Sequence, residues 1–169
     1  MAEYTINTSS IRIPPQSLEA EMALLGSIML RPEAMYEVLD AVSPAYFYAD
    51  RHRLIFETMQ ELFSKSVPID FLSLSSRLKE KQLLEQVGGN VFITELASLV
   101  PSSASVRHYA DIVRKKHMMR KLIEASEDIA RIGFDESADL EESLDAADKK
   151  IFEITNQGGS HKFVEMKDT

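Results

Sequence analysis

Histidines are the first side chains in this chain whose type could serve catalysis or hold a metal. None belongs to an HExxH-type pair and none has the spacing of metal ligands; the four are His52, His108, His117 and His161. His52 precedes an apolar run on an expected amphipathic helix, which favours a structural role at the edge of a core. His108 and His117 stand among Lys and Arg, so we expect both to be solvated.

Acidic pairs and phosphate-binding loops are the next candidates for chemistry. Glu141–Glu142 and Asp145–Asp148 fit a solvated helix face, because nothing suggests a pocket that would separate their pKa values. The sequence has neither a G-x-x-x-x-G-K-[ST] loop nor a G-x-G-x-x-G loop. It also has no cysteine, which removes disulfides and thiolate zinc sites. We therefore expect no catalytic site, no metal and no cofactor in this chain.

A basic stretch remains as a candidate for nucleic-acid contact. Between positions 107 and 121, six basic residues stand against one acid: Arg107, Arg114, Lys115, Lys116, Arg120 and Lys121. These side chains could bind phosphates. Tyr109 is the only aromatic residue among them, so the stacking platform of single-strand binders is not visible. A charged helix face or a protein–protein contact is the favoured interpretation.

The elements that must position these residues are predicted to be helices, with no strand-rich region. Ser17, Asp50 and Asp70 are expected N-caps, and Pro32 and Pro44 mark helix breaks. Gly88-Gly89 is expected to end a turn. Positions 91–99 could form a strand by composition, but their pattern favours a helix. Position 106 to about Gly133 reads as one helix roughly 40 Å long at 1.5 Å per residue, with Gly133 as its stop.

A second long helix is predicted after Gly133, which makes the pair an antiparallel hairpin. Asp139 and Glu142 resemble a capping box, and apolar residues then recur at helical spacing to Ile154. The stretch 157–160, Gln-Gly-Gly-Ser, is expected to be a flexible break. The hairpin carries more apolar surface than one partner helix covers, so we expect part of it to contact another chain. The residues assigned to hairpin packing and subunit contact are Met118, Met119, Leu122, Ile123, Ile129, Ile132, Leu140, Leu144 and Phe152.

Charge and composition limit the setting in which the chain works. The net charge of −8 argues against a surface devoted entirely to nucleic acid. The sequence has no apolar run long enough to span a membrane and no secretory signal, so we expect a cytoplasmic protein with no membrane partner.

Several strings, in this order, resemble the DnaB-type replicative helicase family. The first is IPPQSLEAE at 13–21, followed by Leu24-Leu25-Gly26. Phe47-Tyr48 with His52 comes next, then Pro68-Ile69-Asp70 and Val87-Gly88-Gly89. The string at 101–104, Pro-Ser-Ser-Ala, leads to YADIVR at 109–114, and KIFEI at 150–154 closes the match. Tyr46 and Ser105 depart from the residues common in the family.

The resemblance implies a collar domain without a motor. It predicts an all-α fold: a flexible arm at 1–12, a compact helical head at 13–104, a long antiparallel helical hairpin at 105–156 and the start of a linker at 157–169. The chain would be a domain excised from a longer ATP-dependent helicase that binds ATP and Mg²⁺ elsewhere. Family hairpins pair into dimers and a trimer of dimers, a hexamer around single-stranded DNA; the other implied partners are the primase C-terminal domain and a helicase loader.

Two functions of different class therefore follow from the sequence. The first is an assembly and docking module that builds the helicase ring and recruits primase and loader. The alternative is a single-stranded nucleic-acid-binding module that uses the basic stretch 107–121.

Overall fold

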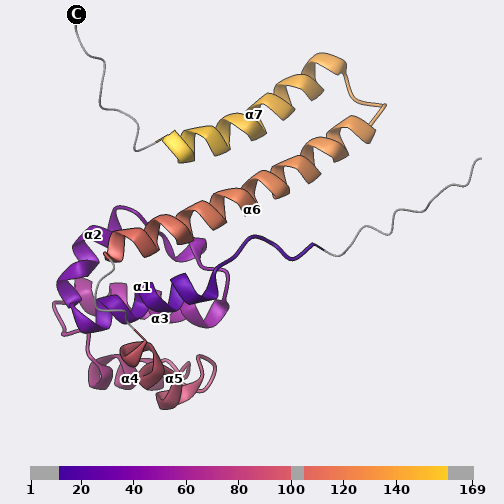
Figure 1. Ribbon diagram of the computed structural model, residues 1–169. Helices are drawn as coiled ribbons and strands as arrows, with labels where there is room; N and C mark the ends of the chain where they lie inside the picture. Colours follow the sequence, from indigo (N-terminus) through magenta and orange to yellow (C-terminus); the bar gives the residue numbers. More distant parts are fainter. Residues whose placement is uncertain (1–11, 100–104, 160–169) are drawn as a thin grey trace, which may run out of the picture.

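The computed structural model describes residues 12–99 and 105–159, and within these ranges the chain is helical without a strand. This confirms the all-α prediction and the division into a compact head and a long projecting hairpin (Figure 1). Two short 3-10 turns, η1 at Pro32–Ala34 and η2 at Pro44–Tyr46, join the first helices. The α-helices are α1 Leu18–Leu30, α2 Met35–Leu39, α3 Asp50–Ser64, α4 Phe71–Glu80, α5 Gly89–Ser98, α6 Val106–Phe134 and α7 Leu140–Gly159.

The core of the head is formed around α1, which packs against α3, α5 and the first part of α6. Leu24, Leu25 and Ile28 of α1 are completely buried, as are Ile55 and Phe56 of α3. Burial of one such side chain stabilises the fold by about 1.5–3 kcal/mol. The first turns of α6 join this core through Val106, Tyr109, Ala110 and Val113. The base of the hairpin is therefore fixed to the head.

Side-chain caps start several helices where the sequence predicted them. The Ser17 hydroxyl accepts a hydrogen bond from the Ala20 N–H, and the Asp70 carboxylate accepts one from the Ser73 N–H. Asp50, however, is the first residue of α3 and not its N-cap; Ala49 holds that position without a side-chain bond. The Asp50 carboxylate instead pairs with Arg53, one turn later, at 3.2 Å.

The start of α3 is capped by a residue far away in the sequence. Glu21 of α1 is buried, and its carboxylate accepts hydrogen bonds from the Tyr48 and Ala49 N–H groups. His52 Nδ1 lies 3.1 Å from the same carboxylate. Since His52 is fully buried and serves the join between α1 and α3, its predicted structural role is confirmed.

The Gly88-Gly89 pair begins a helix and does not end one. Gly88 has a left-handed backbone, with φ at 108°, and is the N-cap of α5. A Cβ at Gly88 would lie 2.8 Å from the Cβ of Phe92, so both the backbone angle and the close approach require glycine here. Positions 91–98 are helical, as their pattern favoured, because Phe92, Ile93 and Leu96 all face the core.

The ends of the hairpin helices differ slightly from the prediction. Gly133 lies inside α6, which continues to Phe134 and ends at Asp135. Asp139 does cap α7, accepting a hydrogen bond from the Glu142 N–H. The predicted flexible break was wrong for the part that is described: Gln157, Gly158 and Gly159 belong to α7. Ser160 and the rest of the predicted linker lie outside the described residues, as do positions 1–11 of the predicted arm. No helix in the described ranges is long and apolar enough to cross a membrane.

Candidate functional site

The hairpin of α6 and α7 projects from the head, and its two helices lie side by side along their length (Figure 1). Their contact is made mainly by small and polar residues. Ala125 is buried between the helices, and Lys150 of α7 pairs with Asp128 of α6 at 3.1 Å. At the end of α7 the Arg114 guanidinium donates to the Gln157 and Gly158 carbonyls. These carbonyls would lack a partner within the helix, so Arg114 caps α7.

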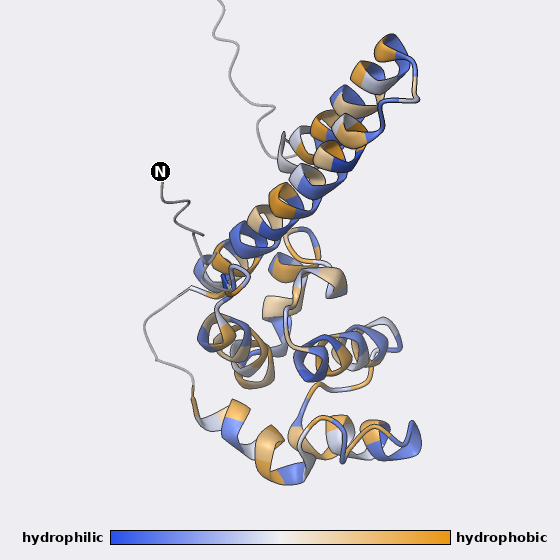
Figure 2. Ribbon diagram, turned by 90° about the vertical axis from the view of Figure 1, so that its right-hand side faces the viewer, coloured by the Kyte–Doolittle hydropathy of each residue, from blue (hydrophilic) through white to orange (hydrophobic). Residues whose placement is uncertain are grey.

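The apolar stripe of α7 is only partly covered by α6. The residues that face α6 are Ser143, Ala147, Lys150 and Ile154, each half-buried. Leu140, Leu144 and Ile151 share the stripe with Ala147 and Ile154 but point to one side and are exposed. No residue of α7 from 140 to 158 is buried. The hairpin therefore presents apolar surface that its own chain does not cover, seen as orange residues along both helices in Figure 2.

The structure divides the predicted hairpin contacts into two groups. Three residues of α6 are half-buried: Met118, Ile129 and Ile132. Ile132 lines a small hollow shared with Ser143 and Ala146 of α7. The other six are exposed, with Leu122 and Leu144 each at 57%, and are available to another molecule: Met119, Leu122, Ile123, Leu140, Leu144 and Phe152. Phe134 at the tip of α6 is 86% exposed and was missed by the sequence assignment.

A polar joint fixes the base of the hairpin on the head. The Arg120 guanidinium donates to the Pro15 carbonyl and to the Tyr46 carbonyl, both at 2.7 Å. It also lies over the Tyr48 ring, 5.5 Å from its centroid. One side chain of α6 thus holds the segment before α1, the end of η2 and the residue whose N–H is bound by Glu21. Burial lowers the pKa of Arg120 from its usual value, but the group keeps its charge.

His117 completes this joint and corrects a prediction. It is buried, not solvated, and its ring stacks on Tyr46 with 4.3 Å between ring centroids. Burial lowers the pKa of His117 to about 4, and the charges of Arg120 and Lys121 lower it further, while Glu124 opposes them. His117 is therefore neutral at physiological pH. His108, one of the other predicted solvated histidines, is exposed.

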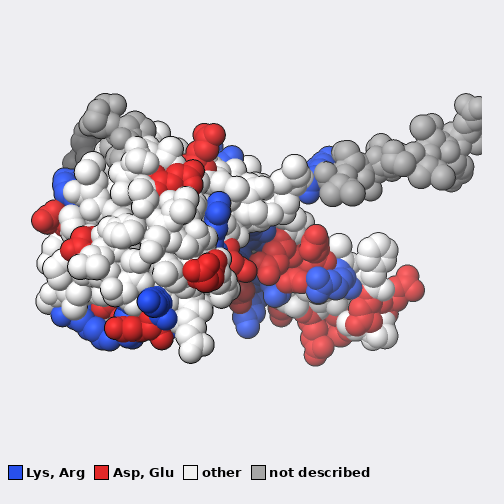
Figure 3. All heavy atoms as spheres, turned by 90° about the horizontal axis from the view of Figure 1, so that it is seen from below, with Lys and Arg blue, Asp and Glu red and all other residues white. Residues whose placement is uncertain are grey.

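The basic stretch does not form one continuous face. Arg114 and Arg120 donate to backbone carbonyls, and Lys121 pairs with Glu124 at 2.7 Å. Arg107, Lys115 and Lys116 form no ion pair within the part of the chain that the structure describes. Because successive residues of a helix are turned by about 100°, the six side chains point in several directions. Acidic side chains gather along the rest of the projecting hairpin (Figure 3).

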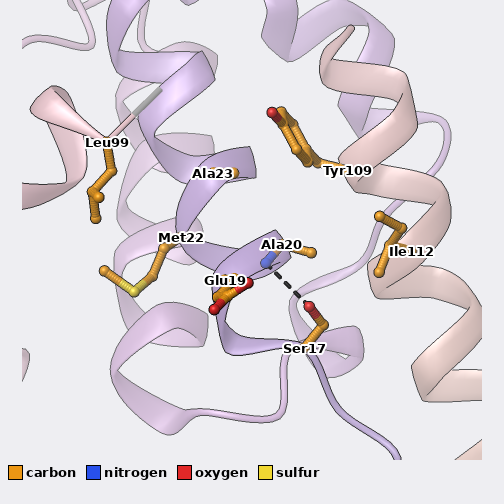
Figure 4. A pocket seen from close by; sticks show the side chains of 8 residues that line it. All are labelled: Ser17, Glu19, Ala20, Met22, Ala23, Leu99, Tyr109 and Ile112. Atoms are coloured by element: carbon orange, nitrogen blue, oxygen red, sulfur yellow. Dashed lines mark hydrogen bonds between the residues drawn. The ribbon is translucent and has the colours of Figure 1, made fainter. Parts of the chain in front are cut away.

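Two hollows border α6. A groove of about 420 Å³ lies between the start of α1 and α6, and its lining includes Met22, Leu99, Tyr109 and Ile112 (Figure 4). A larger cleft of about 780 Å³ lies where the hairpin leaves the head. It is lined from the head by Ile13, Pro14, Ala45 and Tyr48, and from α6 by residues from His117 to Glu127. Within the described ranges no three His, Asp or Glu side chains are placed to hold a metal ion.

Comparison with known proteins agrees with this architecture. Residues 13–115 match the family model described as the DnaB-like helicase N-terminal domain. The chain is 37% identical to the replicative DNA helicase DnaB of Geobacillus stearothermophilus over 159 residues, which cover 94% of this chain and 35% of that protein. It is 36% identical to the replicative DNA helicase DnaC of Bacillus subtilis over 157 residues, 93% of this chain and 35% of that protein.

Two solved structures share the fold. The crystal structure of the N-terminal domain of DnaB helicase from Mycobacterium tuberculosis superposes with a TM-score of 0.78 at 31% identity, covering 83% of this chain and 99% of that one. A DnaB-like replicative helicase whose structure was determined with its interactions with primase gives a TM-score of 0.67 at 28% identity, covering 90% of this chain and 36% of that one. The chain spans about a third of the length of the full helicases it matches.

Proposed function

This chain belongs to the family of DnaB-like helicase N-terminal domains, and on that premise we propose that it acts as the non-catalytic collar of a hexameric replicative helicase. In this role the head-and-hairpin unit joins subunits and receives partner proteins, and the hairpin is the subunit contact. The ATP-driven unwinding would lie in the remaining length of the relatives. ATP and Mg²⁺ would bind there too, since this sequence has no loop that could hold a nucleotide phosphate.

The uncovered apolar surface of the hairpin is the observation that supports assembly most directly. Leu122 and Ile123 of α6 are exposed on a helix that projects from the head, as are Leu140, Leu144 and Phe152 of α7. Exposed apolar surface of this extent is typical of a protein interface. A second copy of the chain would cover it, with hydrophobic burial supplying most of the free energy and the charges setting the orientation.

Light scattering over a range of protein and salt concentrations tests this assignment. We expect a dimer or larger assembly, and we expect Leu122→Asp to shift it toward monomer without loss of helical circular dichroism. Val91→Asp is the matched control, because Val91 is 81% exposed on the head and far along the chain from the hairpin. A chain that is monomeric at every concentration, or a folded Leu122→Asp variant that still associates, would contradict the hairpin contact.

We also propose primase as a partner, through its C-terminal domain, and a helicase loader as a second one. Support for primase comes from a structural neighbour that was solved with its interactions with primase. Titration calorimetry of this chain with a primase C-terminal domain measures the contact. Binding that needs the assembled state would be lost in Leu122→Asp, whereas binding to the head alone would survive it.

A direct nucleic-acid role is the second candidate. It is favoured by Arg107, Lys115 and Lys116, which have no ion pair within the described residues. Fluorescence anisotropy with a single-stranded oligonucleotide at low and high salt tests it. Binding through phosphates would weaken steeply with salt, and replacing these three residues by alanine would reduce that dependence. Absence of binding at low salt would eliminate this function for the chain.

A further inference from the structure

The face of α6 turned away from α7 carries a second regular strip of residues, which we call the outer seam. Met119, Ile123, Ser126, Ala130 and Phe134 are separated by four, three, four and four positions, and all five are exposed. Alternating steps of three and four place residues on one side of a helix and are typical of helices that pack along their length. Ala125 and Asp128, which contact α7, lie on a different side of α6.

The middle of the outer seam is suited to close approach by another helix. Ser126 and Ala130 have small side chains, and the neighbouring Gly133 has open space where a Cβ would stand. The Ser126 hydroxyl donates to the Ile123 carbonyl of its own helix at 2.6 Å, so it needs no outside partner. The larger residues Met119, Ile123 and Phe134 flank this small-residue centre. Helices that pack with small residues at their crossing approach most closely.

Charge decides the direction in which a second α6 helix can lie on this seam. Lys115 and Lys116 stand toward the base of the hairpin, and both lack an ion pair within the described residues. Asp135, Glu136 and Asp139 stand at its tip and are exposed. Parallel helices would bring the acidic tips together, whereas antiparallel helices place each acidic tip beside the lysines of the other copy. Like charges in contact are unfavourable and opposite charges select the pairing.

We propose that the outer seam pairs with the outer seam of a second copy, the two α6 helices running antiparallel about a twofold axis near Ser126. This inference rests on the proposed function, because it specifies how the hairpins pair. With the axis at that position, Ile123 meets Ala130 of the other copy and Met119 meets its Phe134. Ile123 and Ser126 also line the cleft at the hairpin base, beside Ile13 and Tyr48. Phe134 of each copy therefore reaches the rim of the other copy's cleft.

Single cysteines test the pairing, since the natural chain has none. A disulfide forms only where two Cα atoms lie within about 7 Å. Ser126→Cys sits near the twofold axis and should form a disulfide-linked dimer under mild oxidation. Phe134→Cys alone should not, because the two tips point in opposite directions. A mixture of Met119→Cys and Phe134→Cys chains, one of them carrying a tag that changes its mass, should form the mixed dimer. Leu144→Cys on α7 is the control and should stay uncrosslinked.

The outcomes separate this pairing from the broader assembly role. A linked Ser126→Cys dimer together with the mixed Met119–Phe134 dimer supports the antiparallel seam. Efficient linking of Phe134→Cys to itself, or none at Ser126 in a chain that light scattering shows to be dimeric, overturns the seam while leaving hairpin assembly intact. A chain that is monomeric throughout overturns both. Circular dichroism of each variant confirms that the substitution has not unfolded the hairpin.

Discussion

The carboxylate of Glu21 lies 3.1 Å from Nδ1 of His52, and the two residues join α1 to α3 inside the head. The same carboxylate accepts hydrogen bonds from the Tyr48 and Ala49 N–H groups, where α3 has no cap of its own. A buried donor left without a partner costs about 1–3 kcal/mol. This contact therefore holds the start of α3 and, through Tyr48, the ring against which Arg120 rests.

Glu21→Ala should lower the free energy of unfolding by about 2–4 kcal/mol, because it removes the acceptor for two buried N–H groups. Glu21→Gln should cost less, since one amide oxygen can still accept from them. Urea denaturation followed by circular dichroism measures both. Glu19→Ala is the control: it removes an acid from the same first turn of α1, but Glu19 is exposed and should change stability little. Equal effects of Glu19→Ala and Glu21→Ala would contradict the capping role.

Arg120→Met should loosen the joint between hairpin and head. The substitution leaves the Pro15 and Tyr46 carbonyls without their donor and should destabilise the fold by about 2–3 kcal/mol. Arg120→Lys keeps the charge but cannot donate to both carbonyls in the same way, so it should recover only part of the loss. Hydrogen exchange at the middle of α6 reports the loosening. Exchange that is unchanged in Arg120→Met would show that the joint is held by the apolar contacts alone.

Acid should destabilise the chain partly through His117. Its pKa is about 4 in the folded chain against about 6.5 when unfolded, so below pH 6.5 only the unfolded chain takes up this proton. The free energy of unfolding should therefore fall as the pH drops from 6.5 to 4, by on the order of 1–3 kcal/mol from this group.

The comparison that isolates this effect is His117→Gln against His108→Gln. Both variants are measured by urea denaturation at pH 7 and pH 4.5. His117→Gln should lose less stability between these pH values than the natural chain does, because it lacks the buried titrating ring. His108 is exposed, so its variant should follow the natural chain. Identical pH dependence in all three proteins would rule out the buried neutral state of His117.

Gly88→Ala should destabilise the head, whereas Gly133→Ala should stabilise the hairpin. At Gly88 the left-handed backbone costs an L residue about 1–2 kcal/mol, and the added Cβ would also press on Phe92. At Gly133 a Cβ would meet open space inside a helix, where alanine is favoured over glycine by about 0.5–1 kcal/mol. Thermal unfolding of the two variants should show shifts of opposite sign. A shift of the same sign would contradict the backbone assignment at one of these glycines.

Helix positions were largely predictable from the sequence because they depend on local signals. Ser17 and Asp70 cap the helices that follow them, and the Asp139–Glu142 pair starts α7 as its spacing indicated. Errors fell at helix ends, where the same residue has several local roles. Gly133 was taken as a stop although α6 continues through it to Phe134, and Gly158 stays helical because Arg114 accepts the task of capping α7.

The candidate site was predictable in kind but not in detail. Apolar spacing on both hairpin helices indicated more hydrophobic surface than one partner covers, and the structure exposes Leu122 and Leu144 accordingly. The exposed Phe134 was passed over, although its spacing from Ile123 and Ala130 was visible in the sequence. Which half of an apolar stripe faces α6 depends on how α7 is rotated, and Lys150 and Asp128 fix that rotation through a contact between residues distant in the chain.

By itself the sequence determined the helical class, the order of elements, the hairpin and the absence of a nucleotide-binding loop, because these follow from the spacing and identity of neighbouring residues. Only the tertiary structure decided that Glu21 caps a helix 27 residues away, that His117 is buried, and that Arg120 is a structural joint and not a free charge. Each of these depends on which backbone groups lack a partner once helices pack. A buried polar group selects its partner by proximity in space, which sequence spacing does not encode.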